Sequence, residues 1–376
     1  MNIVVIFGGA SVEHDVSILT GLHAARNVGD GNRVRLVYLT RDNEMRMGGV
    51  HSAISNIENY IKAGKAGASG AKFGRRCAFD GRVLRPSGGG IRGLFSRISR
   101  GFYVDAVINC CHGGAGEDGR LAAYFDVLGV PVTSSGPIGA WNIQSKSRTR
   151  ELLINAGFPQ PKFQILDKNK TSHKIPPFPL IVKPDTLGSS IGITVAADED
   201  ELRDAVDLAF LLDSRVVVEE FIPDAVEINC AAFRYGGRVV TSACEVIKKG
   251  GAMLDFSKKY LDSASGFVKK GASTKEVHPR EDEIKALAAR AYDVLGAGGI
   301  VRADFLISNG GSGEIYLNEC NSVPGFLSYH LWLKAGIPYK TLLNMVASQA
   351  RREFDSRTPV QNFKSDVLEK NKSLVK

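Results

Sequence analysis

Three stretches of the sequence carry residue types and spacings that could bind phosphate or activate an acid. The first is KPDTLGSSIG at positions 183–192, which follows a short apolar run. Glycine lets backbone N–H groups approach phosphate oxygens closely, the hydroxyls of Ser189 and Ser190 add donors, and Lys183 supplies a positive charge. The spacing is not that of a Walker loop, so these residues alone fit a structural turn equally well.

The second stretch combines Arg302 and Asp304 with the run NECNSVPG at positions 318–325. Strand alternation places Arg302 and Asp304 on one face, and likewise Glu319 and Asn321. Two carboxylates and an amide oxygen suit Mg²⁺ shared with phosphates better than zinc, whereas an ion pair between Arg302 and an acid is the structural alternative. The backbone N–H of Gly325, in the turn that follows, could stabilise an oxyanion.

The third stretch is GGASVEH at positions 8–14, and a similar glycine-rich run, CHGGAGEDG, occupies positions 111–119. Neither has the G-x-G-x-x-G spacing, which disfavours a dinucleotide-binding fold. Glu13 could bind a substrate ammonium group or simply favour the start of a helix. The same two alternatives, a site residue or a structural one, stay open for His112.

Short apolar runs and amphipathic stretches indicate an α/β unit followed by two further units, and therefore a mixture of α/β and α+β structure. The first unit has expected strands at 3–7, 34–39 and 104–110 and a helix at 16–28. The next has a helical pattern at 136–156, strands at 163–166, 180–182 and 216–221, and a helix at 199–212. The last has strands at 228–233, 239–246, 299–306 and 315–318 and a helix at 284–295. We expect domains at 1–134, 135–222 and 223–350, with a polar basic tail at 351–376 that is poorly ordered.

Composition excludes several classes of protein. The chain has 376 residues, 44% hydrophobic and 23% charged, as in ordinary globular proteins of more than one domain. No apolar run approaches the roughly 18–20 residues of a bilayer span, and the N-terminus lacks the pattern of a signal peptide, so we expect a cytoplasmic protein without a membrane partner. Six cysteines without C-x-x-C spacing are expected to be reduced core residues.

The net charge of +8 is concentrated in one segment, residues 62–100, which has ten basic residues and one acid. Its many glycines favour a mobile or hairpin insertion. A solvated loop is the simplest interpretation, and a docking surface for an acidic carrier protein is the alternative. Nucleic acid is the weaker option because only Phe73, Phe79 and Phe95 interleave the charges.

Seven motifs in order resemble the D-alanine-D-alanine ligase family of the ATP-grasp superfamily. They are GGASVEHDVS (8–17), HGGAGEDG (112–119), KPDTLGSSIG (183–192), EEFI (219–222), KKYL (258–261), RADF (302–305) and NECNSVPG (318–325). The resemblance implies three domains with ATP bound between the central and C-terminal ones. It also implies a ligase that transfers the γ-phosphate of ATP to a carboxylate, after which an amine attacks the acylphosphate.

The resemblance assigns roles by motif position. The ATP phosphates would contact Lys146, Lys183 and Lys259. The ribose would contact Glu219 and Glu227, and the adenine would contact Glu220, Phe221 and Ile222. Asp304, Glu319 and Asn321 would hold Mg²⁺, or alternatively Mn²⁺. Arg302 and the Gly325 N–H would face the oxyanion. Glu13 would bind the ammonium group of the first substrate, with Ser189 and Tyr260 as hydrogen-bond partners of Glu13. His112 would lie near the reacting acyl group.

Some positions depart from the family pattern. The loop after Gly325 is about four residues shorter than the one that grips the second substrate, and Ser145 and Ala122-Ala123 replace the family's Asp and Gln-Gly. Two enzymes therefore remain: a ligase joining two D-alanines in cell-wall synthesis, or a relative joining another amino acid, amine or carrier-bound acceptor. A catalytically inactive binding protein is a weaker rival because the expected ligand residues are present. The resemblance also predicts a homodimer.

Overall fold

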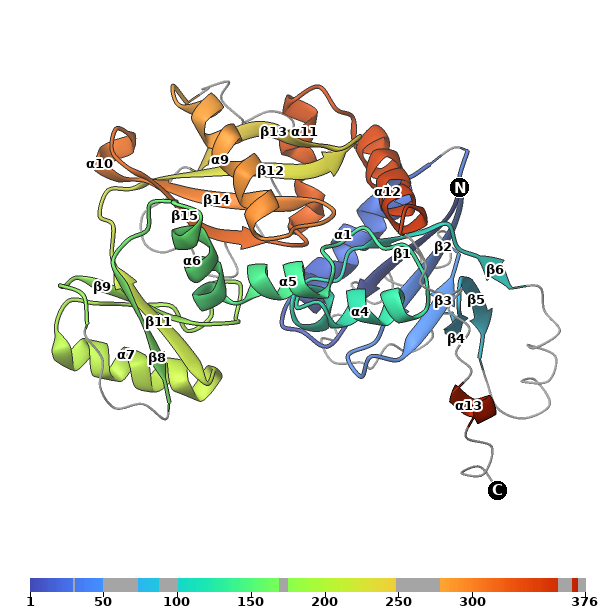
Figure 1. Ribbon diagram of the computed structural model, residues 1–376, viewed down its shortest axis with the longest axis horizontal. Coiled ribbons are helices and arrows are strands. Elements are labelled where there is room, and N and C mark those ends of the chain that lie inside the picture. The colour runs from blue at the N-terminus through green and yellow to red at the C-terminus, as the bar shows by residue number, and fades with distance from the viewer. Residues whose placement is uncertain are drawn as a thin grey trace, which may run out of the picture.

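The structure, a computed structural model, contains three β-sheets with helices packed around them (Figure 1). It describes residues 1–29, 31–49, 74–87, 101–168, 175–247, 278–357 and 367–370. Each sheet corresponds to one of the three units expected from the sequence. The division into three domains at the stated boundaries remains a prediction.

The first sheet has a parallel centre and an antiparallel extension. Strand β1 (Asn2–Gly8) pairs in parallel with β2 (Arg33–Leu39) and β7 (Ala106–Asn109), as the apolar runs predicted. The middle of β1 is fully buried because both faces of the sheet are covered. Helix α1 (His14–Asn27) packs against β1. The extension consists of β3 (Met45–Gly48), β4 (Arg75–Asp80), β5 (Val83–Pro86) and β6 (Phe102–Tyr103).

The hairpin β4–β5 lies inside the basic segment 62–100, in agreement with the hairpin alternative. The rest of that segment lies outside the described residues apart from positions 74, 81, 82 and 87. After β7 come the 3-10 turn η1 (Gly114–Gly116) and helix α4 (Arg120–Val127). Leu121 and Phe125 of α4 share a hydrophobic core with the first sheet.

The expected helix at 136–156 is wrong in one respect, because the structure has two helices. Helix α5 (Pro137–Gln144) ends at Ser145, and α6 (Lys146–Asn155) begins after it. Ser145 has an extended backbone, and its hydroxyl accepts a hydrogen bond from the N–H of Arg148. Serine is a strong N-cap, so it starts a new helix where the apolar pattern appeared continuous.

The central sheet has the order β10-β9-β11-β8. Its strands are β8 (Phe163–Asp167), β9 (Leu180–Pro184), β10 (Thr194–Ala196) and β11 (Arg215–Glu220). Helix α7 (Glu199–Leu212) covers one face with Ala205 and Ala209, and Asp198 caps its N-terminus by accepting from two backbone N–H groups. This sheet and α7 have a hydrophobic core of their own.

The C-terminal sheet has the order β13-β12-β14-β15 and is antiparallel throughout. Its strands are β12 (Val226–Tyr235), β13 (Arg238–Ile247), β14 (Val301–Ile307) and β15 (Ile315–Asn321). One face packs on α9 (Glu281–Val294) through residues such as Phe305. The short α10 (Ser308–Gly311) connects β14 to β15.

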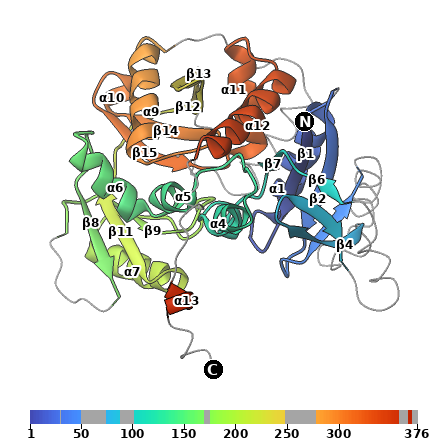
Figure 2. The same cartoon turned by 45° about the vertical axis from the view of Figure 1, so that its right-hand side comes forward.

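The opposite face of the C-terminal sheet shares a core with the first sheet. This core contains Phe7 and Ile108 from the first sheet, Phe233 from β12, and Trp332, which is fully buried. Its helices are η2 (Gly325–Ser328), α11 (Tyr329–Lys334) and α12 (Tyr339–Asp355), and Figure 2 shows α12 beside β1 and the C-terminal sheet.

The expected start of a poorly ordered tail at residue 351 is wrong, because α12 continues to Asp355. Phe354 packs under the guanidinium groups of Arg82 and Arg357, and Asp355 pairs with Arg82 at 3.4 Å. Helix α13 (Val367–Lys370) follows. Among the described residues no helix is long and apolar enough to cross a membrane.

Candidate functional site

Lys183 belongs to a buried charge cluster that joins the central sheet to the C-terminal sheet. Its Nζ contacts the carboxylate of Glu219 on β11 and lies 3.0 Å from Asn318 Oδ1 on β15. Arg150 on α6 donates to the same carboxylate at 2.8 and 3.1 Å and to the carbonyl of Leu317 at 2.6 Å. Burial would raise the pKa of Glu219, but Arg150 and Lys183 hold it at about 2. The cluster therefore carries two cations around one ionised acid.

Lys146 lies beside this cluster because Asp185 holds the start of α6. The Asp185 carboxylate accepts from the Ser145 hydroxyl at 2.8 Å and from the Ser147 N–H at 2.6 Å. Ser145, a departure from the family pattern, is thus held by an acid from the 183–192 run. Burial lowers the pKa of Lys146, and the nearby Glu319 carboxylate opposes that shift. The amine of Lys146 donates to the carbonyl of Leu187.

The polar residues of β14 and β15 lie on one face, as strand alternation predicted. Asp304 stands opposite Glu319, and Arg302 opposite Asn321. Arg302 binds both oxygens of Asp304 at 2.7 Å, and Asn321 Nδ2 donates to Asp304 at 3.0 Å. The ion pair that the sequence offered as an alternative is therefore present, and the strand pairing and the Asn321 bond place Asp304 beside the other expected ligands.

The donor set on this face fits a hard divalent cation. Two carboxylates and a side-chain amide provide oxygen ligands of the kind that Mg²⁺ prefers. Asn229 on β12 stands opposite Asp304 and is only 8% exposed, and its Oδ1 has no hydrogen-bond partner among the described residues. No group of three or more His, Cys, Asp or Glu side chains suited to a metal occurs in the described part of the chain. A cation here would depend on the amide oxygens as well.

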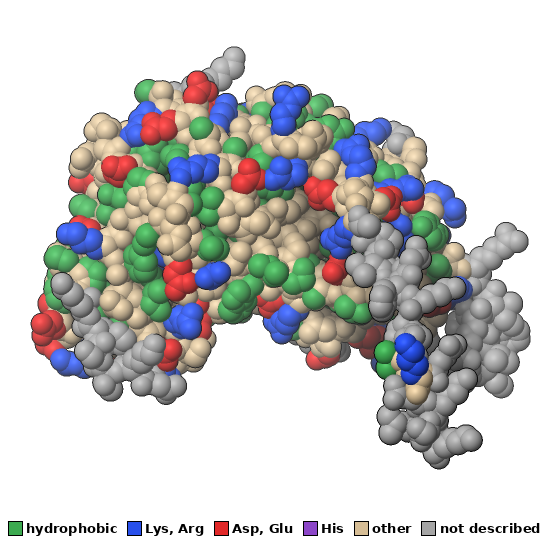
Figure 3. Space-filling view, viewed as in Figure 1, with side chains coloured by type: hydrophobic (Ala, Val, Ile, Leu, Met, Phe, Trp, Pro, Cys, Tyr) green, Lys and Arg blue, Asp and Glu red, His purple; other side chains and the backbone are tan. Residues whose placement is uncertain are grey.

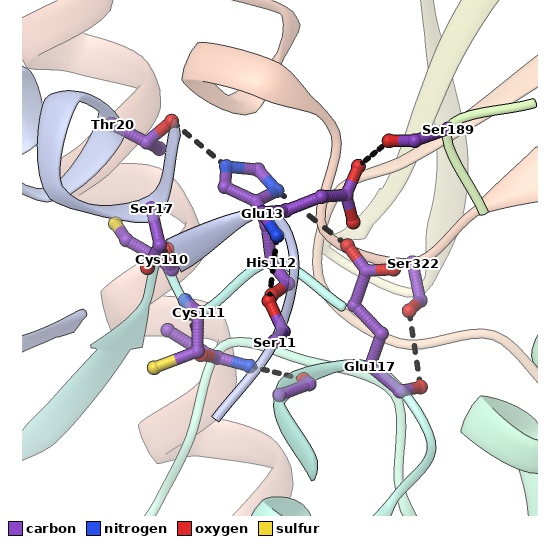
Figure 4. Close-up of polar contacts among 12 residues, drawn as sticks. Ser11, Glu13, Ser17, Thr20, Cys110, Cys111, His112, Glu117, Ser189 and Ser322 are labelled. Atoms are coloured by element: carbon purple, nitrogen blue, oxygen red, sulfur yellow. Dashed lines mark hydrogen bonds and ion pairs between the residues drawn. The ribbon is translucent and has the colours of Figure 1, made fainter. Parts of the chain in front are cut away.

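Glu13 connects the first sheet to the 183–192 run. Its carboxylate accepts a hydrogen bond from the hydroxyl of Ser189, and it is 8% exposed (Figure 4). Ser189 and Ser190 both have a positive φ, of 57° and 58°, a conformation that costs energy for residues other than glycine. The serine hydroxyls are therefore presented by a strained turn that reaches across to Glu13, as the resemblance implied.

His112 and Glu117 form a second polar group beside Glu13. His112 Nδ1 lies 3.5 Å from Glu117 Oε1, and the Ser11 hydroxyl donates to the His112 carbonyl at 2.6 Å. Burial raises the pKa of Glu117, the hydrogen bond from His112 opposes the rise, and the charge of Glu13 adds to it. Figure 4 shows the Glu117 carboxylate, the His112 ring and Glu13 gathered at one place.

The remaining expected site residues lie on two strand ends. Glu220 is the last residue of β11, Phe221 and Ile222 follow it, and the Phe221 N–H donates to the carbonyl of Pro179 at 3.0 Å. Glu227 lies on β12 opposite Leu306. A Cβ on Gly325 would meet nothing within 4 Å, so this residue borders open space. Lys259 and Tyr260 lie outside the described residues.

Comparisons with known proteins identify the family of this chain. Two family models match, described as D-ala D-ala ligase N-terminus over residues 2–135 and D-ala D-ala ligase C-terminus over residues 152–347. The chain belongs to the D-alanine-D-alanine ligase family. It is 29% identical to the D-alanine–D-alanine ligase of Thermosipho africanus over 98% of each chain.

Solved structures of two bacterial ligases share the fold. The D-alanine-D-alanine ligase from Coxiella burnetii superposes with a TM-score of 0.76 over 94% of this chain and 96% of that one, at 20% identity. The VanG D-Ala:D-Ser ligase from Enterococcus faecalis superposes with a TM-score of 0.70 over 93% of this chain and 100% of that one, at 25% sequence identity. The expected ATP-grasp fold and family are confirmed, and the chain is an ATP-dependent ligase that forms a peptide bond.

The sequence did not single out Arg150, Glu117 or Asp185. Glu117 lies five residues after His112 in a motif that was quoted for the family, so that spacing was a usable signal. Arg150 offered none, because a basic residue in a polar helix is usually exposed, whereas this one is only 3% exposed. On the face shown in Figure 3, basic and acidic side chains are intermixed, so the surface charge does not mark the position of the buried cluster.

Proposed function

We propose that this enzyme joins two D-alanine molecules, using ATP and Mg²⁺, and that it does so in the cytoplasm. The observation that supports the proposal best is the contact of Lys183 with Asn318 at 3.0 Å. This contact brings the lysine-bearing central sheet against the strand that carries Glu319 and Asn321. Phosphates bound between these sheets would meet cations on one side and cation-binding oxygens on the other.

Each end of the proposed site has a distinct task. Lys146 and Lys183 would bind ATP phosphates, with Ser189 and Ser190 as further donors and Lys259 as a third cation. The adenine would lie at Glu220, Phe221 and Ile222, and the ribose at Glu219 and Glu227. Because Glu219 is only 3% exposed, its main contribution in this state is to hold Lys183 and Arg150.

Asp304, Glu319 and Asn321 would hold Mg²⁺, which supplies positive charge to the phosphate oxygens when bound. Both reaction steps place negative charge on oxygen, so donors fixed in advance lower the barrier. Arg302 and the Gly325 N–H are the donors expected to face that charge. Glu13, paired with Ser189, would bind the ammonium group of the first amino acid, with Tyr260 nearby and His112 near the acyl group.

A different acceptor is the second candidate, and the turn after Gly325 favours it. Phe326, Leu327 and Ser328 have positive φ values of 51°, 53° and 52°, and α11 begins immediately afterwards at Tyr329. The family loop that grips the second substrate is longer, so the acceptor site of this chain is formed differently. Other acceptors, including carrier-bound ones, and the expected homodimer remain predictions of the sequence.

Phosphate release with ATP and Mg²⁺ across a panel of D- and L-amino acids tests the proposal. We expect turnover with D-alanine alone and a product whose mass is that of the dipeptide. No turnover with D-alanine alone, together with turnover of a pair of different substrates, would support the second candidate. No turnover with any pair would remove both.

A further inference from the structure

We propose that Thr20 is a positioning residue, whose hydroxyl fixes the His112 ring relative to the turn that carries Gly325. This inference rests on the proposed ligase function, in which His112 and the Gly325 N–H face the reacting group. Thr20 lies on α1, His112 follows β7, and the turn follows β15. One buried hydroxyl therefore connects three segments that are far apart in the sequence.

The contacts of Thr20 define a three-way junction. Its Oγ1 lies 2.8 Å from His112 Nε2 and 3.2 Å from the backbone N of Phe326. Thr20 is fully buried and His112 is 4% exposed, so water does not compete freely for these bonds. Figure 4 shows the Thr20 hydroxyl pointing at the imidazole ring on the side away from Glu117.

The direction of these hydrogen bonds follows from the groups involved. A backbone N–H can only donate, so Phe326 donates to Thr20 Oγ1, and the hydroxyl can still donate to His112 Nε2 or accept from it. On the other side of the ring, Nδ1 faces the Glu117 carboxylate. A carboxylate accepts the Nδ1 hydrogen, so Nε2 carries the lone pair that the Thr20 hydroxyl needs. In the neutral form of the ring, the junction therefore selects the tautomer with hydrogen on Nδ1.

The turn after Gly325 needs such a restraint. Three successive residues, Phe326 to Ser328, adopt the left-handed conformation that is unfavourable for residues with a side chain. The turn is held by Leu327, whose N–H donates to Pro324 at 2.8 Å, and by the Phe326 ring, which lies edge-on to His23. Thr20 and His23 lie three positions apart on α1, so a single helix face contacts this turn.

A second bond supports the same connection. The Ser322 hydroxyl donates to the Glu117 carbonyl at 3.3 Å, which ties the glycine-rich loop to the other end of the turn. The loop with His112 and Glu117 and the turn with Gly325 are thus joined on both sides. Of the two hydroxyls that make these connections, Thr20 and Ser322, Thr20 is the one that also contacts the imidazole ring.

Three variants test the role of the hydroxyl in catalysis. Thr20→Val keeps the shape but removes the hydroxyl, and we expect kcat to fall by about 10- to 100-fold while KM for ATP changes by less than about 2-fold. Thr20→Ser keeps the hydroxyl and should restore kcat. Ser242→Ala is the matched control, because Ser242 is also fully buried and accepts a backbone N–H, from Ala231, but lies on β13. Equal kcat losses in Thr20→Val and Ser242→Ala, or an unchanged kcat in Thr20→Val, would overturn the proposal.

A measurement without substrate separates this inference from the proposed function. The ring ¹⁵N shifts of the seven histidines can be recorded by NMR, and His112→Gln identifies the signals of His112. At a pH where the ring is neutral, we expect a single tautomer with hydrogen on Nδ1 in the native protein and a mixture of tautomers in Thr20→Val. Unchanged His112 signals would overturn the positioning role, even if the native enzyme turned over D-alanine. A native enzyme inactive with D-alanine but with the expected shifts would overturn the proposed substrate and not this role. Thr20→Cys replaces Thr20→Val if the latter does not fold.

Discussion

The two ends of the candidate site shift the pKa of a carboxylate in opposite directions. At the central sheet, Glu219 is surrounded by Arg150 and Lys183, and its pKa is held at about 2. Beside the first sheet, Glu117 is mostly buried near Glu13, and its pKa is raised. One end is rich in cations and the other in carboxylates. This difference shows where phosphates and where an ammonium group would each find opposite charge.

The largest effect is expected from the residues between these ends. Glu319→Ala removes one of the two facing carboxylates, and we expect turnover to fall by about 10³-fold or more, because cation binding supplies several kcal/mol of stabilisation. Phosphate release measured against Mg²⁺ concentration tests this, with thermal unfolding to show that the fold is kept. Glu314→Ala, an exposed acid just before β15, is the control. Full activity in Glu319→Ala would contradict the magnesium assignment.

At the cation-rich end, Lys183→Met should weaken both ATP binding and stability. We expect KM for ATP to rise by about 10- to 100-fold, and stability to fall by about 3 kcal/mol because Glu219 loses one partner of a buried ion pair. Steady-state kinetics and urea unfolding measure the two effects. The double variant Lys183→Met with Glu219→Gln should regain stability but not ATP binding. Recovery of both would mean that Lys183 acts only through Glu219.

At the carboxylate-rich end, Glu13→Gln should affect the amino-acid substrate alone. The amide keeps the hydrogen bond with Ser189 but loses the charge, so we expect KM for the first amino acid to rise by about 10-fold with KM for ATP unchanged. Asp15→Asn is the control, since Asp15 lies two residues away and is exposed, paired with Arg41. An equal rise in KM for ATP would argue against separate roles for the two ends.

The smallest expected effect is in the acid dependence of stability. The pKa of Glu219 is lowered from 4.5 to about 2, so its contribution is complete above about pH 4.5 and is lost as the pH falls towards 2. Glu117 has a raised pKa, and its penalty is present at higher pH and disappears in acid. Glu219→Gln should therefore reduce the loss of stability between pH 5 and 3 by on the order of 1 kcal/mol. Urea unfolding across this range measures both effects. Relative to the native protein, Glu117→Gln should change the pH dependence of the free energy of unfolding in the opposite direction to Glu219→Gln.

Much of the fold could be predicted because its signals are local. The buried strand β1 and the amphipathic helix α7 follow from runs of apolar residues and from helical spacing. The break at Ser145 was missed because a cap is a single residue inside a pattern that otherwise continues. The end of α12 was missed because Phe354 packs against Arg82, which is far away in the sequence, a contact that the polar sequence around it does not reveal.

The candidate site was predictable only where its residues fall in quoted motifs. The sequence singled out Asp304 and Glu319, and strand alternation correctly placed Arg302 and Asp304 on one face of β14. Arg150 and Thr20 were not identified, because their importance comes from contacts with residues 69 and 92 positions away. Such contacts depend on how the units pack together, which periodicity does not determine.

The shared core described above has a consequence for cooperativity. Phe7, Phe233 and Trp332 belong to one continuous cluster, whereas the residues beneath α7 form a separate cluster. The first and last thirds of the chain should therefore melt as a single calorimetric unit, with the β8–β11 layer able to open at lower temperature. A nucleotide that bridges the two cores would merge these events into one endotherm.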